Sequence, residues 1–222
     1  MGYSNLLRKE ADQIWAKILE HPFLVELSKG TLPIEKFKFF TIQDYLFLID
    51  FSKALAIATS KTNTVEDLKG FTEFLHSTMT VEMDSLKALA NKLGISNEEL
   101  TQATPSPTNY AYTRHILLTA YMGSFGEFVS AILPCMWSYQ EIGEKIAKMK
   151  DAEQHPIYSN WVATYSSKEY GNLVKWLRLL LNKLAENSGK TELAIMEERF
   201  IISSKYEYMF WDMAYELQEW GI

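Results

Sequence analysis

The feature that most limits the fold is a helical repeat of apolar residues over residues 123–150. Along one predicted face, residues recur at steps of four and three: Phe128, Ile132, Cys135, Tyr139, Ile142 and Ile146. This spacing predicts an α-helix with one buried face. Because Pro134 has no backbone N–H, we expect this helix to bend just before Cys135. The predicted helix thus carries the chain's only cysteine, with a tyrosine one turn further on.

Helical spacing of apolar residues also marks the rest of the chain. Gly94 follows one such segment, as a glycine at a helix C-terminus commonly does, and Ser96 with Glu99 has the spacing of a capping box. The other predicted helices cover residues 6–19, 22–29, 33–60, 65–93, 108–122, 155–165, 168–187 and 191–220. No alternating run indicates a strand, and no linker divides the chain. We therefore predict one all-α domain over residues 1–222, a multi-helix bundle.

The composition is that of an ordinary soluble globular protein. A chain of 222 residues, 47% of them hydrophobic, is long enough for one domain with a sizeable core. The net charge of −6 argues against binding to nucleic acid or to an anionic membrane. A single cysteine excludes an internal disulfide bond, and no apolar run reaches membrane-spanning length. Because the first residues lack a signal-peptide pattern, we predict a cytoplasmic protein.

Cys135 has two interpretations. Free cysteines are among the most buried residue types, so an inert position in the core is one of them. The other is a nucleophile, since a thiol presented on a bent inner helix beside Tyr139 is the arrangement that covalent catalysis needs. The spacing of this one helix leaves both interpretations open.

Two acidic residues fall on apolar helix faces. Asp44 lies in a phenylalanine stripe formed by Phe37, Phe40, Phe47 and Phe51, and Glu207 has Phe200, Phe210 and Trp211 as helical neighbours. A buried carboxylate is costly unless it is paired or hydrogen-bonded. For Asp44, a structural pairing between helices and a functional role are both possible. For Glu207, burial should raise the pKa and suit the carboxyl to proton transfer near neutral pH.

Other candidates are weaker. Tyr112, Tyr139 and Tyr165 could line a pocket and offer hydroxyl groups, although a core position with a satisfied hydroxyl explains each one taken alone. Glu73 and His76 have the spacing that helical di-iron proteins use, but such sites need a second motif of the same kind, which the sequence lacks. We therefore predict no metal site.

Taken together, five motifs in order along the chain resemble the TenA family. They are Gln43-Asp44-Tyr45-x-Phe47, Tyr110-Ala111-Tyr112-Thr113, Leu133-Pro134-Cys135-x-Trp137-x-Tyr139-x-x-Ile142-Gly143, Trp161-x-x-x-Tyr165-Ser166 and Ser204-x-Tyr206-Glu207-x-x-Phe210-Trp211-Asp212. The resemblance covers essentially the whole chain. It implies the haem-oxygenase-like all-helical fold and the activity of thiaminase II, also called aminopyrimidine aminohydrolase.

The resemblance also implies a reaction and its residues. Members hydrolyse thiamin, or the aminomethyl analogue of its pyrimidine, to 4-amino-5-hydroxymethyl-2-methylpyrimidine, without a metal or organic cofactor and commonly as homotetramers. Cys135 would be the nucleophile, Asp44 would bind the ring nitrogen and exocyclic amine, and Glu207 would transfer a proton. The aromatic residues implied to orient or stack on the ring are Phe47, Tyr112, Tyr139 and Tyr165.

The sequence departs from the family pattern at two positions. Leu86 stands four residues after Glu82, where many members have a histidine, and Phe47 stands where many have tyrosine. Two other functions stay open on the sequence: a non-catalytic ligand-binding or regulatory protein, and a helical metal oxidase using Glu73 and His76. The preferred substrate is also not settled by the sequence.

Overall fold

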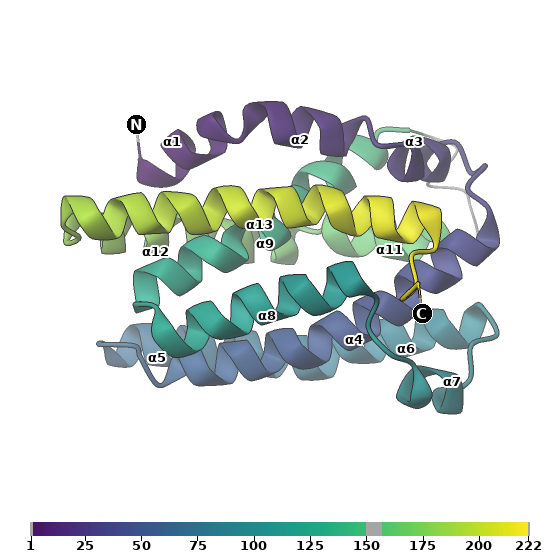
Figure 1. The fold of residues 1–222 in the computed structure, drawn as a ribbon, viewed down its shortest axis with the longest axis horizontal. Helices are drawn as coiled ribbons and strands as arrows, with labels where there is room; N and C mark the ends of the chain where they lie inside the picture. The colour runs from purple at the N-terminus through teal and green to yellow at the C-terminus, as the bar shows by residue number, and fades with distance from the viewer. Residues whose placement is uncertain (1, 150–156, 222) are drawn as a thin grey trace. The chain divides into compact units, whose positions relative to one another are not determined.

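The computed structural model describes residues 2–149 and 157–221, and throughout these two ranges the regular structure is helical, with no strand (Figure 1). The chain groups into two compact units. Unit 1 comprises Met1–Leu32 and Gly126–Tyr215, and unit 2 comprises Pro33–Phe125 and Glu216–Ile222. The all-α class predicted from the sequence is confirmed. The single domain over residues 1–222 stays a prediction.

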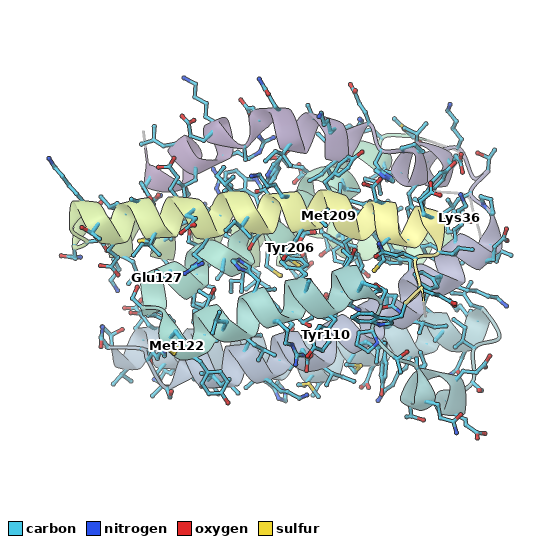
Figure 2. All side chains as sticks on the ribbon, in the orientation of Figure 1. Lys36, Tyr110, Met122, Glu127, Tyr206 and Met209 are labelled. Carbon is cyan, nitrogen blue, oxygen red and sulfur yellow. The ribbon has the colours of Figure 1, made fainter. Side chains whose placement is uncertain are left out.

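Unit 2 is organised along α4 (Ile34–Thr59), which lies side by side with α8 (Pro107–Met122) (Figure 1). The α4 helix also contacts α5 (Val65–Ser77), the π-helical turn η1 (Thr78–Glu82), α6 (Met83–Lys92) and α7 (Asn97–Gln102). Phenylalanine side chains of α4 fill the centre of this unit, because they recur on its inner face at helical spacing. The α8 helix keeps one face exposed, with Tyr110 and Met122 near its two ends (Figure 2).

The helices of unit 1 are α1 (Tyr3–Glu10), α2 (Asp12–Leu19), α3 (Pro22–Ser28), α9 (Phe125–Ile146), α11 (Tyr158–Tyr165), α12 (Lys168–Glu186) and α13 (Lys190–Glu216). The first residue of α9, Phe125, belongs to unit 2, and the helix belongs to unit 1 from Gly126 onward. The inner face predicted for α9 is buried at Phe128, Ile132, Tyr139, Ile142 and Ile146. Pro134 lies inside α9, as expected. None of the described helices is both long and apolar enough to cross a membrane.

Local chemistry explains where several helices begin. The Ser106 hydroxyl accepts a hydrogen bond from the backbone N–H of Asn109 at the start of α8, and Pro107 occupies the first helical position. Ser96 and Glu99 form the predicted capping box at the start of α7. Gly94 follows α6 with φ of 73°, in the left-handed region that glycine adopts without strain.

Four helix predictions need correction. The segment 6–19 forms two helices that are interrupted at Ala11, which is completely buried. The segment 65–93 contains the π-helical turn η1 between α5 and α6. The central helix ends at Ile146, and α13 ends at Glu216, where Leu217 has a φ of 54°. The predicted helix start at residues 155–156 lies outside the described residues.

Candidate active site

Cys135 is half-buried in a stretch of α9 that is otherwise buried on both sides. Leu133 and Pro134 before it, and Met136 and Trp137 after it, are all buried. Cys135 is thus the one residue of the stretch 131–139 that is not fully buried. This exposure favours the interpretation of Cys135 as a reactive residue, because an inert core cysteine is expected to be fully covered.

One turn after Cys135, the Tyr139 ring lies in a cluster of aromatic side chains from three helices of unit 1. Its centroid is 4.8 Å from the Tyr165 ring of α11 and 5.3 Å from the Trp211 ring of α13. Trp161 of α11 lies 4.9 Å from Tyr165 and 6.0 Å from Tyr139. Edge-to-face and tilted contacts of this kind are favourable beyond the area that they bury. The structure therefore brings the predicted site residues Tyr139 and Tyr165 into direct contact.

Glu207 lies on α13, one turn before Trp211, and only 2% of the residue is exposed. Two contacts show that α9 and α13 run in the same direction: the Ser130 hydroxyl donates to the backbone carbonyl of Met196 at 2.5 Å, and further along both helices Tyr139 packs on Trp211. Glu207 therefore lies on a helix that packs against α9, one turn before the residue that contacts Tyr139.

The Tyr139–Tyr165 contact depends on a glycine of α9. A Cβ atom added at Gly143 would lie 2.6 Å from the backbone carbonyl carbon of Tyr165 and 2.9 Å from the backbone nitrogen of Ser166. Backbone atoms cannot move aside as the end of a flexible side chain can. Gly143 therefore lets the end of α11 approach α9 closely enough for Tyr165 to reach Tyr139.

We predict that Gly143→Ala destabilises the protein by about 1–3 kcal/mol, because the methyl group overpacks the α9–α11 contact. Urea unfolding should show a lower midpoint with an unchanged slope. The matched control is Gly171→Ala on α12, where the added Cβ would meet only the side-chain amide of Gln140 at 3.3 Å. That variant should be neutral or slightly stabilised by its better helix propensity. Equal midpoints for the two variants would contradict the packing argument.

In unit 2, three more predicted residues lie on α4 and α8. Asp44 of α4 is 7% exposed, and Phe47, three residues later, is also buried. The Phe47 ring lies 5.3 Å from the ring of Tyr112, a buried residue of α8. The structure therefore brings Phe47 and Tyr112 together, with Asp44 on the turn of α4 before Phe47.

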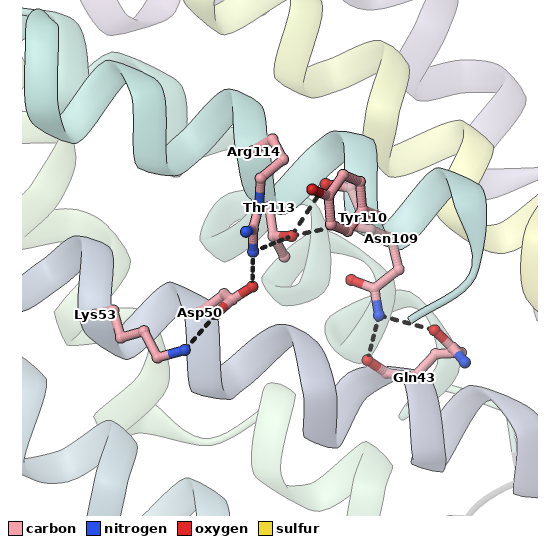
Figure 3. A network of polar contacts seen from close by, with 7 residues as sticks. All are labelled: Gln43, Asp50, Lys53, Asn109, Tyr110, Thr113 and Arg114. Carbon is pink, nitrogen blue, oxygen red and sulfur yellow. Dashed lines mark hydrogen bonds and ion pairs between the residues drawn. The ribbon is translucent and has the colours of Figure 1, made fainter. Parts of the chain in front are cut away.

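Polar contacts of Gln43 fix α8 against α4 beside Asp44 (Figure 3). The Asn109 side-chain amide donates to the Gln43 backbone carbonyl at 2.8 Å and to the Gln43 side-chain oxygen at 2.9 Å. The same side-chain oxygen accepts from the backbone N–H of Ser106 at 2.9 Å, and the Gln43 side-chain nitrogen donates to the carbonyl of Thr104 at 3.2 Å. These bonds hold the start of α8, and with it Tyr112, at a defined position along α4.

Further along the same two helices, Asp50 pairs with Lys53 and with Arg114 (Figure 3). The additional Arg114 pair links α4 to α8 a second time. Both basic partners are exposed, so these pairs contribute modestly to stability.

Sequence reasoning did not assign a role to Gln43, Asn109 or Gly143. Gln43 and Gly143 belong to motifs quoted above. A glutamine on a buried helix face beside an acid also indicates that its side chain makes hydrogen bonds there. The sequence also did not indicate that Trp161 and Trp211 would pack around Tyr139. Leu86, where many family members have a histidine, is buried on α6.

The metal-oxidase alternative has no support in the described residues. Glu73 and His76 are both exposed on α5. Within residues 2–149 and 157–221, no three His, Cys, Asp or Glu side chains gather closely enough to hold a metal ion.

Comparisons with known proteins agree with the motifs. Residues 8–217 match the TENA/THI-4/PQQC family. An aminopyrimidine aminohydrolase of Halalkalibacterium halodurans is 40% identical over all of this chain and 99% of its own length. A solved TenA homologue from P. horikoshii OT3 superposes with a TM-score of 0.90 at 37% identity, covering 97% of this chain and 99% of that one.

A more distant structure confirms the fold class. A domain from Shewanella denitrificans, described as having a heme oxygenase-like fold, superposes with a TM-score of 0.79 at 12% identity over 96% of this chain and 92% of that one. At this identity the likeness bears on the fold alone, and it confirms the haem-oxygenase-like architecture expected from the motifs. With its motifs, its helical fold and a family match over nearly its whole length, the chain belongs to the TENA/THI-4/PQQC family, as a TenA-type member.

Proposed function

We propose that this chain is an aminopyrimidine aminohydrolase, or thiaminase II, which hydrolyses the exocyclic C–N bond of 4-amino-2-methylpyrimidines. The product is 4-amino-5-hydroxymethyl-2-methylpyrimidine. The observation that carries the proposal is the half-buried Cys135, on an otherwise buried stretch of α9 that also carries Tyr139 of the aromatic cluster. The name of the full-length Halalkalibacterium halodurans relative, 40% identical, supports the enzyme class.

In the proposed mechanism, Cys135 acts as a covalent nucleophile. Its thiolate adds to a carbon of the pyrimidine ring, which breaks the aromaticity and pushes an electron pair toward the exocyclic methylene. The C–N bond then breaks: the amine of the aminomethylpyrimidine leaves as ammonia with a proton supplied by Glu207, whereas the thiazolium of thiamin leaves as neutral thiazole and needs no proton. Water adds to the methylene and gives up a proton, after which the C–S bond breaks and the ring becomes aromatic again. Dividing one displacement into such steps is the advantage of covalent catalysis.

The remaining residues bind the ring. Asp44 accepts hydrogen bonds along the ring's amidine-like edge, one from the exocyclic amine and one from the adjacent ring nitrogen in its protonated form. Phe47 and Tyr112 offer aromatic faces, and Tyr139 and Tyr165 orient the groups around the thiol. The ring contacts within each unit, 5.3 Å for Phe47–Tyr112 and 4.8 Å for Tyr139–Tyr165, support these assignments because they preorganise the side chains. The homotetramer and the cytoplasmic location stay predictions.

Parallel incubation with two substrates tests the proposal. The purified protein, after treatment with a chelator and dialysis, is mixed with the aminomethylpyrimidine or with thiamin, and the loss of each compound is followed by chromatography. We expect the hydroxymethylpyrimidine as product in both reactions and ammonia from the first. If neither compound is consumed, the proposed activity is wrong. If activity is lost on chelation and restored by iron or manganese, the metal-oxidase alternative takes its place.

We further predict that the aminomethylpyrimidine is the better substrate. The rings that we assign to binding are bulky and pack in pairs within each unit, with centroids 5.3 Å apart for Phe47–Tyr112 and 4.8 Å apart for Tyr139–Tyr165. Such rigid aromatic walls suit one flat ring better than a ring with a second heterocycle attached. The larger thiazolium of thiamin would gain fewer contacts and hinder access of water to the methylene. The measurement is kcat/KM for both substrates under one set of conditions. A tenfold preference for thiamin, about 1.4 kcal/mol in transition-state free energy, would contradict this prediction.

A further inference from the structure

A cavity of about 570 Å³ opens on unit 1, and no residue that we assign to the active site lines it. Its walls come from the start of α1, the second half of α9, the α11–α12 junction and most of the length of α12. Hydroxyl and amide side chains make up much of the lining, which includes Ser4, Asn5, Ser167 and Asn182. The volume falls within the range of small-molecule sites in proteins.

The α12 side of the cavity is basic. Lys168, Gly171, Lys175, Arg178 and Asn182 line it at steps of three and four, so they share one face of the helix. The cavity lining contains three cations against one carboxylate, that of Glu144, which accepts a hydrogen bond from the Gln140 side chain at 2.8 Å. The chain as a whole has a net charge of −6, whereas the side chains that line this cavity are net positive.

Arg178 is held in a fixed position within this lining. Its guanidinium lies 3.9 Å from the centroid of the Trp137 ring and donates a hydrogen bond to the Asn5 side-chain oxygen at 2.8 Å. Burial lowers the pKa of Arg178, while the charge of Glu141 acts in the opposite direction. Arginine stays protonated at neutral pH, so the cavity holds a partly desolvated, preorganised cation.

The two lysines differ from Arg178 in being exposed, and neither has an ion-pair partner among the described residues. Gly171 lies between them on the same face and adds no side chain of its own. The side-chain amide of Gln140 lies over Gly171, 3.3 Å from the position of an added Cβ, and it can donate a hydrogen bond to an anion held between Lys168 and Lys175. The start of α12 is close by, where backbone N–H groups favour negative charge.

We infer that this cavity binds a small molecule through its phosphate group. A fixed arginine matches the geometry of phosphate oxygens, and two flexible lysines supply further positive charge around it. The space exceeds that of one phosphate, and the amide and hydroxyl lining can hydrogen-bond a polar body attached to it. The inference concerns a second site and does not depend on the proposed hydrolase activity.

Calorimetric titration with pyrophosphate, at an ionic strength held constant with sodium chloride, tests the site. We expect saturable binding to the unmodified protein and at least a tenfold loss of affinity in Lys168→Gln/Lys175→Gln. The matched control is Lys69→Gln/Lys87→Gln, which removes two exposed lysines of α5 and α6. The control should bind as the unmodified protein does.

A second readout places the ligand beside Arg178. Because the guanidinium stacks on Trp137, pyrophosphate binding should change the tryptophan fluorescence, and the change should be absent in Trp137→Phe. The inference is wrong if pyrophosphate does not saturate, or if the two double variants lose affinity equally, which would show non-specific attraction only. Unchanged affinity in Lys168→Gln/Lys175→Gln would equally overturn it.

Discussion

Cys135→Ser should lower kcat by about three orders of magnitude or more while leaving the fold and pyrimidine binding nearly intact. A hydroxyl is a far weaker nucleophile than a thiolate, yet it is almost the same size. The half-buried position of Cys135 allows this change without opening a cavity or burying an unsatisfied hydroxyl. The measurements are kcat for the aminomethylpyrimidine, the dissociation constant of the hydroxymethyl product, and the urea midpoint of both proteins.

The chain offers a direct control for this experiment, because Cys135 is its only cysteine. A thiol-alkylating reagent such as iodoacetamide therefore reports on this one residue. Activity of the unmodified protein should fall in proportion to the alkylated fraction, and the hydroxymethyl product should slow the reaction. A serine variant that turns over within about tenfold of the parent would rule out the covalent role.

Most helices could be predicted from the sequence because the helical spacing of apolar residues agrees with the residues that start and end helices. Gly94 and the Ser96–Glu99 capping box, for example, act through contacts within a few residues. The interruption at Ala11 was missed because neither glycine nor proline marks it. The π-helical turn η1 was missed because it preserves a nearly helical spacing of apolar residues.

In the candidate site too, features set by nearby residues could be predicted from the sequence, whereas contacts between distant helices could not. Burial of Asp44 and Glu207 followed from their apolar helical neighbours, and it is confirmed. The contact of Tyr139 with Trp211 joins helices far apart in the sequence, and no local pattern specifies it. The role of Gly143 is similar, because the reason for a glycine there is the backbone of α11. The family motifs include Tyr139, Gly143 and Trp211, but a motif does not say which of these residues touch or why a glycine is needed.

The second large effect concerns the two carboxylates: we expect substitution of one to change mainly kcat and substitution of the other to change mainly KM. Glu207→Gln should lower kcat by about 10²–10⁴-fold with little change in KM, because the amide keeps the shape but cannot transfer a proton. Asp44→Asn should mainly raise KM, by about tenfold or more, because the carboxylate accepts from both the exocyclic amine and the protonated ring nitrogen, whereas the amide has only one accepting oxygen. The measurements are kcat and KM of both variants with the aminomethylpyrimidine.

Both carboxylates are almost fully buried, so loss of stability is the effect that must be separated from loss of function. Each substitution is nearly isosteric, and urea midpoints measured alongside the kinetics show whether the fold is retained. The pH profile gives a readout that instability cannot imitate: in the parent, kcat should depend on the protonation of Glu207, and Glu207→Gln should lose that limb of the profile. If Glu207→Gln instead changes KM alone while Asp44→Asn lowers kcat, the two roles are exchanged, with Asp44 transferring the proton and Glu207 binding the ring.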